Sequence, residues 1–422
     1  MPETNALQER LLSVPNFKNS KEKKEYLEAM FRGEVPFALA NGGMGIDFSG
    51  EEFVISMMRS RAIGVLSASA PGYEFIRPGL KIKGKTIDEY SAKERKEIFY
   101  QWNKIALDKM VANVRQQCKY GILGANCMKI LDHYDSTRED MIANGEIDIG
   151  FVGAGLATDL PERMSQGDAQ HMYYVPIVSS VLAARGILRS AKQCKGRFPD
   201  AFYVELPPEA GGHIASRRNE NDPKEFDPQT IKEGIEKMLK KYGVTKHVPI
   251  ILAGGIAFRD QIEHAHSLGY EVAMATPLLL SQESGMPNKT LVEKYLNPDI
   301  SVIDDRKSST GYESRRLDTP YTERTPESIR RNIRRCVQCV MPSCKYMEGA
   351  NDLKTDDNYC IANDLSRARF GMDNGILFVG KGIYELRASG IYEFNGKPYI
   401  PIIREILHAL MNMNAPKISD MA

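Results

Sequence analysis

Short apolar runs alternate with glycine-rich turns and helix-length stretches from Val35 onward, and this alternation constrains the fold more than any other feature. Buried parallel strands read as nearly continuous apolar runs, and parallel neighbours need a crossover long enough to hold a helix. Eight such runs predict an α/β protein with a closed (β/α)8 TIM barrel. The predicted strands are 35–39, 62–66, 121–125, 147–152, 173–178, 201–205, 249–253 and 271–275.

The 422 residues exceed the roughly 250 of a typical barrel, so extensions are expected. We predict an N-terminal helical arm over 1–34, a barrel over 35–330, and a C-terminal segment over 331–422 with four clustered cysteines and a closing helix. Residues 72–120 form an insertion after the second strand. Apolar residues about 3.6 positions apart predict a long helix there, either beside the barrel mouth or in the outer ring.

The charge is nearly balanced, with 56 Lys and Arg against 55 Asp and Glu, a net of +1. This argues against a nucleic-acid-binding protein, which would show a basic excess. Apolar runs stay short of the 18 or so residues of a membrane-spanning helix, and the N-terminus lacks the apolar core of a secretory signal. We expect a cytoplasmic protein that binds neither nucleic acid nor membrane and that can form a homodimer.

Glycine-rich turns follow the first and sixth predicted strands, at the end of a barrel where enzymes of this fold carry their active sites. The first turn, 41–45, has three glycines in four residues, which lets the backbone approach a flat ligand. The other turn is Glu-Ala-Gly-Gly-His over 209–213. Its glycines can present N–H groups to an anion, and His213 is a candidate catalytic residue.

Two further turns follow the seventh and eighth predicted strands. Gly254-Gly255 ends the seventh, and Ala275-Thr276 ends the eighth about 20 residues later. Paired turns at these places are the usual phosphate grip of barrel enzymes, which use backbone N–H groups and a helix N-terminus. We therefore predict a phosphate-bearing ligand.

Four of the seven cysteines lie within 25 residues of one another. In a cytosolic enzyme, such a cluster indicates metal binding before it indicates disulfides. Four thiolates match either an iron–sulfur cluster or a zinc site. Zinc sites more often use two Cys-x-x-Cys pairs, and one occurs here, which favours iron–sulfur. The predicted ligands are Cys336, Cys339, Cys344 and Cys360.

The order of these motifs, together with Gly-Ala-Asn at 124–126 and Gly-Ala-Gly at 153–155, resembles the nitronate monooxygenase (2-nitropropane dioxygenase) family of FMN-binding TIM barrels. The four-cysteine segment resembles that of a narrower group, the FMN- and 4Fe–4S-containing acyl-carrier-protein dehydrogenase/isomerases of FabX type. The resemblance implies FMN as cofactor. The residues it implies around FMN are Asn41, Gly42, Gly43, Met44, Asn126, Glu205, Gly211, Gly212, Gly254, Gly255, Ala275 and Thr276.

The narrower resemblance implies an FMN-dependent oxidoreductase that acts on an acyl thioester carried by acyl carrier protein, in unsaturated fatty-acid biosynthesis. His213 would remove the Cα proton as base, since imidazole titrates near neutral pH, while a hydride leaves Cβ for the flavin N5. Asn126 and backbone N–H groups near Gly42 would stabilise the enolate-like oxygen. A 4Fe–4S cluster would serve a structural or an electron-relaying role.

Three other functions fit part of the sequence. A nitronate monooxygenase, oxidising alkyl nitronates with FMN and O2, would use the same barrel motifs but leave the four cysteines without a role. The sequence has no separate Gly-x-Gly-x-x-Gly unit for binding a nicotinamide cofactor. Flavin barrels can bind nicotinamide without such a unit, so an NAD(P)H-dependent enoyl thioester reductase remains an alternative. A non-catalytic FMN and iron–sulfur electron carrier or sensor would have no use for the histidine of the 209–213 turn.

Overall fold

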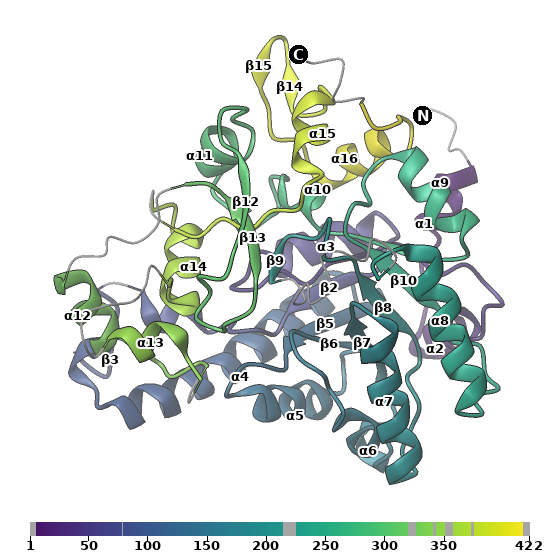
Figure 1. The fold of residues 1–422 in the computed structure, drawn as a ribbon, viewed down its shortest axis with the longest axis horizontal. Coiled ribbons are helices and arrows are strands. Elements are labelled where there is room, and N and C mark those ends of the chain that lie inside the picture. The colour runs from purple at the N-terminus through teal and green to yellow at the C-terminus, as the bar shows by residue number, and fades with distance from the viewer. Residues whose placement is uncertain are drawn as a thin grey trace.

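The computed structural model describes residues 6–77, 79–213, 225–319, 326–340, 343–350, 358–372 and 375–416. Eight parallel strands curl into a nearly closed barrel surrounded by helices (Figure 1). This confirms the predicted TIM barrel. The strands, in sheet order, are β1 (Ala40–Asn41), β11 (Glu271–Met274), β10 (Ile250–Ala253), β8 (Phe202–Glu205), β7 (Tyr173–Val178), β6 (Ile149–Gly153), β5 (Leu123–Met128) and β2 (Gly64–Ser67).

The first predicted strand is displaced along the chain, because 35–39 lead into β1 rather than form it. The Leu39 N–H donates to the Leu11 carbonyl at 2.8 Å, so part of this stretch bonds to the N-terminal arm instead of the sheet. The other seven predicted runs overlap observed strands to within a few residues. Strand ends are set by ladder partners, which an apolar run does not reveal.

The barrel closes between β1 and β2 partly through a side chain. Ala40 and Ile63 form an isolated parallel bridge. Beyond it, Asn41 Oδ1 accepts from the Val65 N–H at 2.7 Å, and Asn41 Nδ2 donates to the Val65 carbonyl at 2.9 Å. A buried amide thus satisfies backbone groups that a longer strand would otherwise pair.

Helices pack around the outside of the barrel. The 26-residue α4 lies against α3 and α5 in this ring, and its buried face includes Phe99, Leu107 and Val114. Between β2 and α4 the chain forms η1 (Tyr73–Ile76), the small hairpin β3 (Lys81–Ile82) and β4 (Lys85–Thr86), and η2 (Ile87–Glu89). The ring helices are α3 (Glu51–Arg59), α4 (Ala92–Gln117), α5 (Tyr134–Asn144), α6 (Leu160–Arg163), α7 (Val181–Cys194), α8 (Pro228–Lys241) and α9 (Arg259–Ser267), with η3 (Gly167–Ala169) after α6.

The N-terminal arm consists of α1 (Ala6–Leu11) and α2 (Ser20–Phe31). Leu27, Met30 and Phe31 of α2 are buried with the apolar residues inside the barrel. Phe31 stacks on Tyr173 at the start of β7, with ring centroids 4.0 Å apart. The arm therefore fills the N-terminal end of the barrel and leaves the opposite end for a ligand.

The chain after β11 covers that opposite end and one flank (Figure 1). Strands β9 (Gly212–His213), β13 (Ser314–Leu317) and β12 (Val302–Asp305) form a separate antiparallel sheet. No helix in the described ranges is long and apolar enough to cross a membrane. The remaining elements are α10 (Thr276–Leu279), α11 (Asn288–Thr290), η4 (Leu291–Tyr295), α12 (Pro326–Arg334), α13 (Lys345–Ala350), α14 (Ile361–Arg369), α15 (Ile383–Ala388), β14 (Glu393–Phe394), β15 (Lys397–Pro398) and α16 (Ile403–Leu410).

Candidate active site

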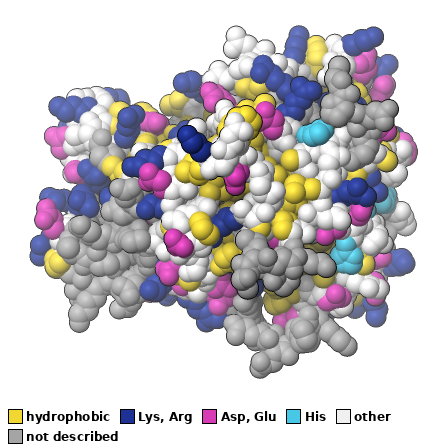
Figure 2. Space-filling view, turned by 90° about the horizontal axis from the view of Figure 1, so that it is seen from above, with side chains coloured by type: hydrophobic (Ala, Val, Ile, Leu, Met, Phe, Trp, Pro, Cys, Tyr) yellow, Lys and Arg dark blue, Asp and Glu magenta, His cyan; other side chains and the backbone are white. Residues whose placement is uncertain are grey.

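A cavity of about 240 Å³ lies at the C-terminal ends of the barrel strands. Barrel enzymes carry their active sites at this end. Figure 2 views the molecule from above, and apolar side chains gather near the middle of that face. His213 and all the residues predicted to surround a cofactor line this one cavity: Asn41, Gly42, Gly43, Met44, Asn126, Glu205, Gly211, Gly212, Gly254, Gly255, Ala275 and Thr276.

Asn126, within β5, packs against the glycine turn after β1. Its Nδ2 donates to the Gly43 carbonyl at 3.2 Å, and a Cβ on Gly43 would lie 2.3 Å from the Asn126 Cβ. Asn126 Oδ1 is buried without a hydrogen-bond partner among the described residues. Because burying an unpaired acceptor costs about 1–3 kcal/mol, this oxygen marks a place where a ligand N–H would be stabilised.

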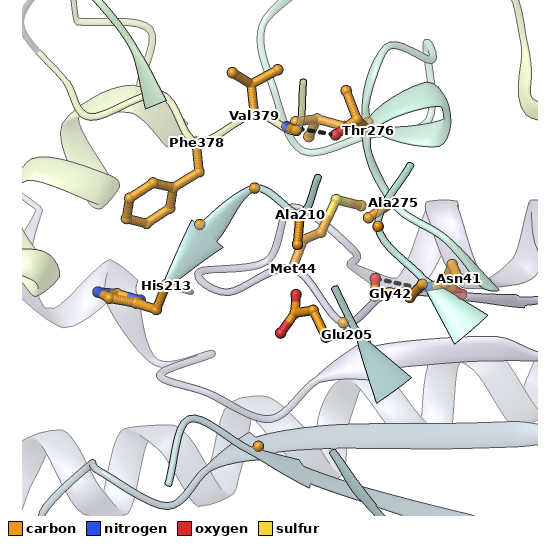
Figure 3. Close-up of a pocket in the computed structure, with 18 of the residues that line it drawn as sticks. Asn41, Gly42, Met44, Glu205, Ala210, His213, Ala275, Thr276, Phe378 and Val379 are labelled. Atoms are coloured by element: carbon orange, nitrogen blue, oxygen red, sulfur yellow. Dashed lines mark hydrogen bonds between the residues drawn. The ribbon is translucent and has the colours of Figure 1, made fainter. Parts of the chain in front are cut away.

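Glu205 ends β8 and points into the middle of the cavity, near Met44 (Figure 3). Burial raises the pKa of its carboxyl to about 7, because the charged form loses solvation. Near neutral pH the group therefore exists in both protonation states. It can donate a hydrogen bond as an acid or accept one as a carboxylate.

His213 lies at one side of the cavity, while Ala275 and Thr276 lie at the other (Figure 3). The Phe378 ring packs edge-on against the imidazole, with centroids 5.2 Å apart. His213 Nε2 lies 2.6 Å from Ser308 Oγ. Burial lowers the pKa of His213 to about 4, so the imidazole is neutral at pH 7 and able to take a proton.

The turn that carries His213 is held by a buried cation. Arg315 on β13 is fully buried, and its Nη1 donates to the carbonyls of Pro207 at 2.9 Å and Ala210 at 2.6 Å. Its Nε pairs with Asp304 at 2.7 Å. The guanidinium thus fixes both ends of the 207–210 turn, a role that the sequence analysis did not anticipate.

The far side of the cavity has the backbone that a phosphate grip needs. Gly254 and Gly255 have φ of +86° and +72°, a region that residues with a Cβ rarely adopt. Thr276 begins α10, and its Oγ1 accepts from the Gly380 N–H at 3.0 Å. The Thr276 oxygen is thus already engaged by the C-terminal segment, while its hydroxyl proton can still be donated.

The C-terminal segment supplies a wall of the cavity that the sequence analysis missed. A Cβ on Gly211 would lie 2.3 Å from the Val379 carbonyl carbon, which shows how closely this segment covers the histidine turn. No sequence motif predicts this wall, because apolar residues that follow a cysteine cluster have the same composition as ordinary hydrophobic core. It consists of Ile361, Leu365, Phe378, Val379, Gly380, Gly382 and Leu386.

The four predicted metal ligands line a second, smaller cavity of about 20 Å³ beside α14. Burial raises the pKa of each thiol, and the neighbouring cysteines raise it further at Cys339, Cys344 and Cys360. Among the described residues, no group of three or more His, Cys, Asp or Glu side chains is placed to hold a metal ion. The structure therefore gathers the cysteines but does not show the predicted metal site.

The sequence matches the nitronate monooxygenase family over residues 33–391, which is most of the chain. Proteins of this family typically use FMN. No curated protein matches the sequence.

Several solved structures share the fold at low sequence identity. FabK from Thermotoga maritima is 18% identical with a TM-score of 0.56, and the match covers 91% of this chain and 94% of FabK. A nitroalkane oxidase from Streptomyces ansochromogenes is 14% identical with a TM-score of 0.54, over 88% and 94%. The enoyl reductase domain of MlnA from Bacillus amyloliquefaciens is 12% identical with a TM-score of 0.61, over 93% and 96%.

Proposed function

The chain belongs to the nitronate monooxygenase family, and from that premise we propose that it is an FMN-dependent dehydrogenase/isomerase of acyl thioesters carried on acyl carrier protein. One observation carries the choice of substrate. His213 faces a cavity whose roof is built from apolar residues of the C-terminal segment, among them Ile361, Leu365 and Phe378. An acyl chain would bury its methylene groups there, at about 0.8 kcal/mol each, whereas a small nitronate has little apolar surface to bury.

The residues present fit FMN. The glycine turn after β1 brings bare backbone to the cavity. Asn126 Oδ1, which has no hydrogen-bond partner in the part of the chain that the structure describes, can accept from a ring N–H. Glu205 offers a second polar contact. Gly254, Gly255, Ala275 and Thr276 would hold the phosphate through backbone N–H groups. When bound, FMN would supply the redox chemistry by accepting a hydride.

His213 is the proposed base. A neutral imidazole would take the Cα proton of the acyl thioester as the hydride leaves Cβ, so the chain loses one proton and one hydride and gains a double bond. The same group could return its proton at C2 after one is removed at C4, which moves the double bond from the 2 to the 3 position. Asn126 or backbone N–H groups near Gly42 would stabilise the negative charge that develops on the thioester oxygen.

We further propose that the four cysteines hold an iron–sulfur cluster, with zinc as the alternative. Two buried and two half-buried cysteines line one cavity, where thiolate charge is poorly solvated, as their raised pKa values indicate, and a bound metal would compensate that charge. Helix α14 would connect the two sites, because Cys360 and Ala362 line the small cavity while Ile361 and Leu365 line the large one.

Anaerobic purification followed by titration with a saturated medium-chain acyl-acyl-carrier protein tests the proposal. We expect flavin absorbance that bleaches on adding the thioester, and roughly four iron atoms per chain. His213→Ala should retain flavin but bleach about 10²–10⁴-fold more slowly, since general-base catalysis contributes that much. Bleaching of the variant at the wild-type rate would remove His213 from the mechanism.

The family makes nitronate oxidation the second candidate. In that reaction, His213 would act on the carbon next to a nitro group, and oxygen would reoxidise the flavin. Flavin that is reduced by an alkyl nitronate but stays oxidised with every acyl thioester would favour this candidate. Reduction by NAD(P)H with turnover of an enoyl thioester would instead indicate an enoyl reductase.

A further inference from the structure

The loop between β1 and α3 closes on itself beside the cavity. The Met44 N–H donates to Ser49 Oγ at 2.9 Å, and the Ser49 N–H donates to the Met44 carbonyl at 3.3 Å. Met44, Gly45 and Phe48 of this loop line the cavity. Asp47 lies between the last two, so the position of this wall depends on how Asp47 is held.

The loop has a backbone conformation that needs support from its neighbours. Ile46 and Asp47 have φ of +55° and +60°, in the left-handed region, which is especially unfavourable for a β-branched residue. Gly285 supports the loop, since its N–H donates to the Phe48 carbonyl at 3.1 Å. A Cβ on Gly285 would lie 2.3 Å from the Asp47 carbonyl oxygen. Such a backbone persists where surrounding contacts hold it.

An ion pair ties Asp47 to the roof of the cavity. Asp47 Oδ2 lies 3.1 Å from Nη2 of Arg369, the last residue of α14, and Ile361 and Leu365 of the same helix line the cavity. The Asp47 and Arg369 side chains are 22% and 27% exposed, so water screens the pair only in part. The Arg369 guanidinium also lies over the Tyr73 ring, 5.6 Å from its centre.

The charge of Asp47 depends on this partner. Burial raises the pKa of the Asp47 carboxyl, and the Arg369 guanidinium opposes that rise. The carboxyl also lies near the N-terminus of α3, because a Cβ on Gly50 would approach Asp47 Oδ1 to 2.1 Å, and a helix N-terminus favours negative charge. Removing Arg369 would therefore leave a poorly solvated carboxylate with less positive charge around it.

We propose that Asp47 and Arg369 are positioning residues that hold α14 closed over the cavity, so that this pair sets how long a bound ligand stays. The two residues are 322 positions apart in sequence, and their segments supply two different walls of the same cavity. Separating these walls opens the cavity, whereas joining them slows the escape of a ligand. With FMN as that ligand the inference rests on the proposed function, but the closure of α14 is a property of the resting protein.

Hydrogen exchange of the full-length protein as purified measures the closure, whatever ligand it holds. Asp47→Asn removes the charge and keeps a residue that tolerates the left-handed conformation, while Arg369→Met keeps an apolar stem. We expect amides of α14 to exchange about three- to tenfold faster in each variant, as for loss of a partly buried ion pair, and amides of β7 to keep the wild-type rate. Arg10→Met is the matched control, since it breaks a part-buried pair with Glu271 at the opposite end of the barrel.

Flavin release tests the consequence. Diluting the flavin-loaded protein and following the recovery of flavin fluorescence should show release about three- to tenfold faster in Asp47→Asn and in Arg369→Met than in wild type. The double variant should match the single variants in both exchange and release, because the two changes break one interaction. Arg369→Lys, which keeps the positive charge, should release flavin more slowly than Arg369→Met.

The outcomes separate the two proposals. Wild-type exchange of α14 in both folded single variants would overturn the inference, as would effects that multiply in the double variant or faster exchange that extends to β7. Faster exchange confined to α14, with no further gain in the double variant, upholds the inference even if acyl thioesters prove not to be substrates or the protein carries no flavin. If Asp47→Asn does not fold, the comparison of Arg369→Met with Arg369→Lys decides the question.

Discussion

Replacing Glu205 with glutamine should flatten the pH dependence of the stability of the flavin-free protein. Burial raises the pKa of this carboxyl from its usual value to about 7. The folded state therefore binds the proton more tightly than the unfolded state does. The free energy of unfolding therefore falls as the pH rises from about 4.3, the unfolded pKa, to about 7, the folded pKa, because the folded state must then ionise a poorly solvated carboxyl.

The size of the effect follows from the shift. With an unfolded pKa of about 4.3 and each pKa unit worth about 1.4 kcal/mol, the ionised carboxyl costs about 3–4 kcal/mol above pH 7 and nothing below pH 4. About 1 kcal/mol of this cost is already present at pH 5, because the unfolded carboxyl is mostly ionised there, so about 2–3 kcal/mol is the expected difference between pH 5 and pH 8. Glutamine has the same shape and carries no charge at either pH.

Urea unfolding at pH 5 and pH 8, for wild type and Glu205→Gln, measures this difference directly. Other groups that titrate in this range, including the buried histidines, are common to both proteins and cancel in the comparison. Glu25→Gln, which changes an exposed glutamate, is the control and should follow wild type. If wild type and Glu205→Gln lose stability in parallel between the two pH values, the argument that burial raises the Glu205 pKa is refuted.

Further predictions concern the glycine turn and the cysteines. Gly211→Ala should destabilise the protein by about 1–3 kcal/mol and lower its flavin content, because the new Cβ collides with the Val379 backbone. Gly167→Ala, where a Cβ meets nothing, is its control in thermal melts monitored by flavin fluorescence, and equal melting of the two would contradict the clash. Cys339→Ser should lose iron by metal analysis, whereas the exposed Cys194→Ser should retain it; full iron content in Cys339→Ser would disprove the ligand assignment.

Much of the barrel could be predicted because buried parallel strands carry a strong local signal. The run 173–178 coincides with β7, and the glycine turns fall at the cavity as expected. The position of the first strand could not be predicted from its apolar run. The barrel closes between β1 and β2 partly through the Asn41 side chain, and not through a longer run of strand residues. Asn41 was predicted only as a cofactor residue, and its bonds to Val65 give it a structural role as well.

The roof of the cavity could not be predicted for a different reason. Phe378 and Val379 have the composition of ordinary core, and only the tertiary fold carries them over the histidine turn. Ser308 and Arg315 were missed for the same reason, since a serine in a polar stretch and an arginine in a strand have no special sequence context. Contacts between segments about 100 residues apart leave no local pattern to read.

The roof also bears on the order of events during biosynthesis. Chains leave the ribosome from the N-terminus, so all eight barrel strands emerge before the segment 361–386 that covers them. Until that segment arrives, the nascent barrel presents an open apolar mouth to solvent and to chaperones. Retention of the proposed flavin is therefore a late step, completed when residues 361–386 fold over the cavity.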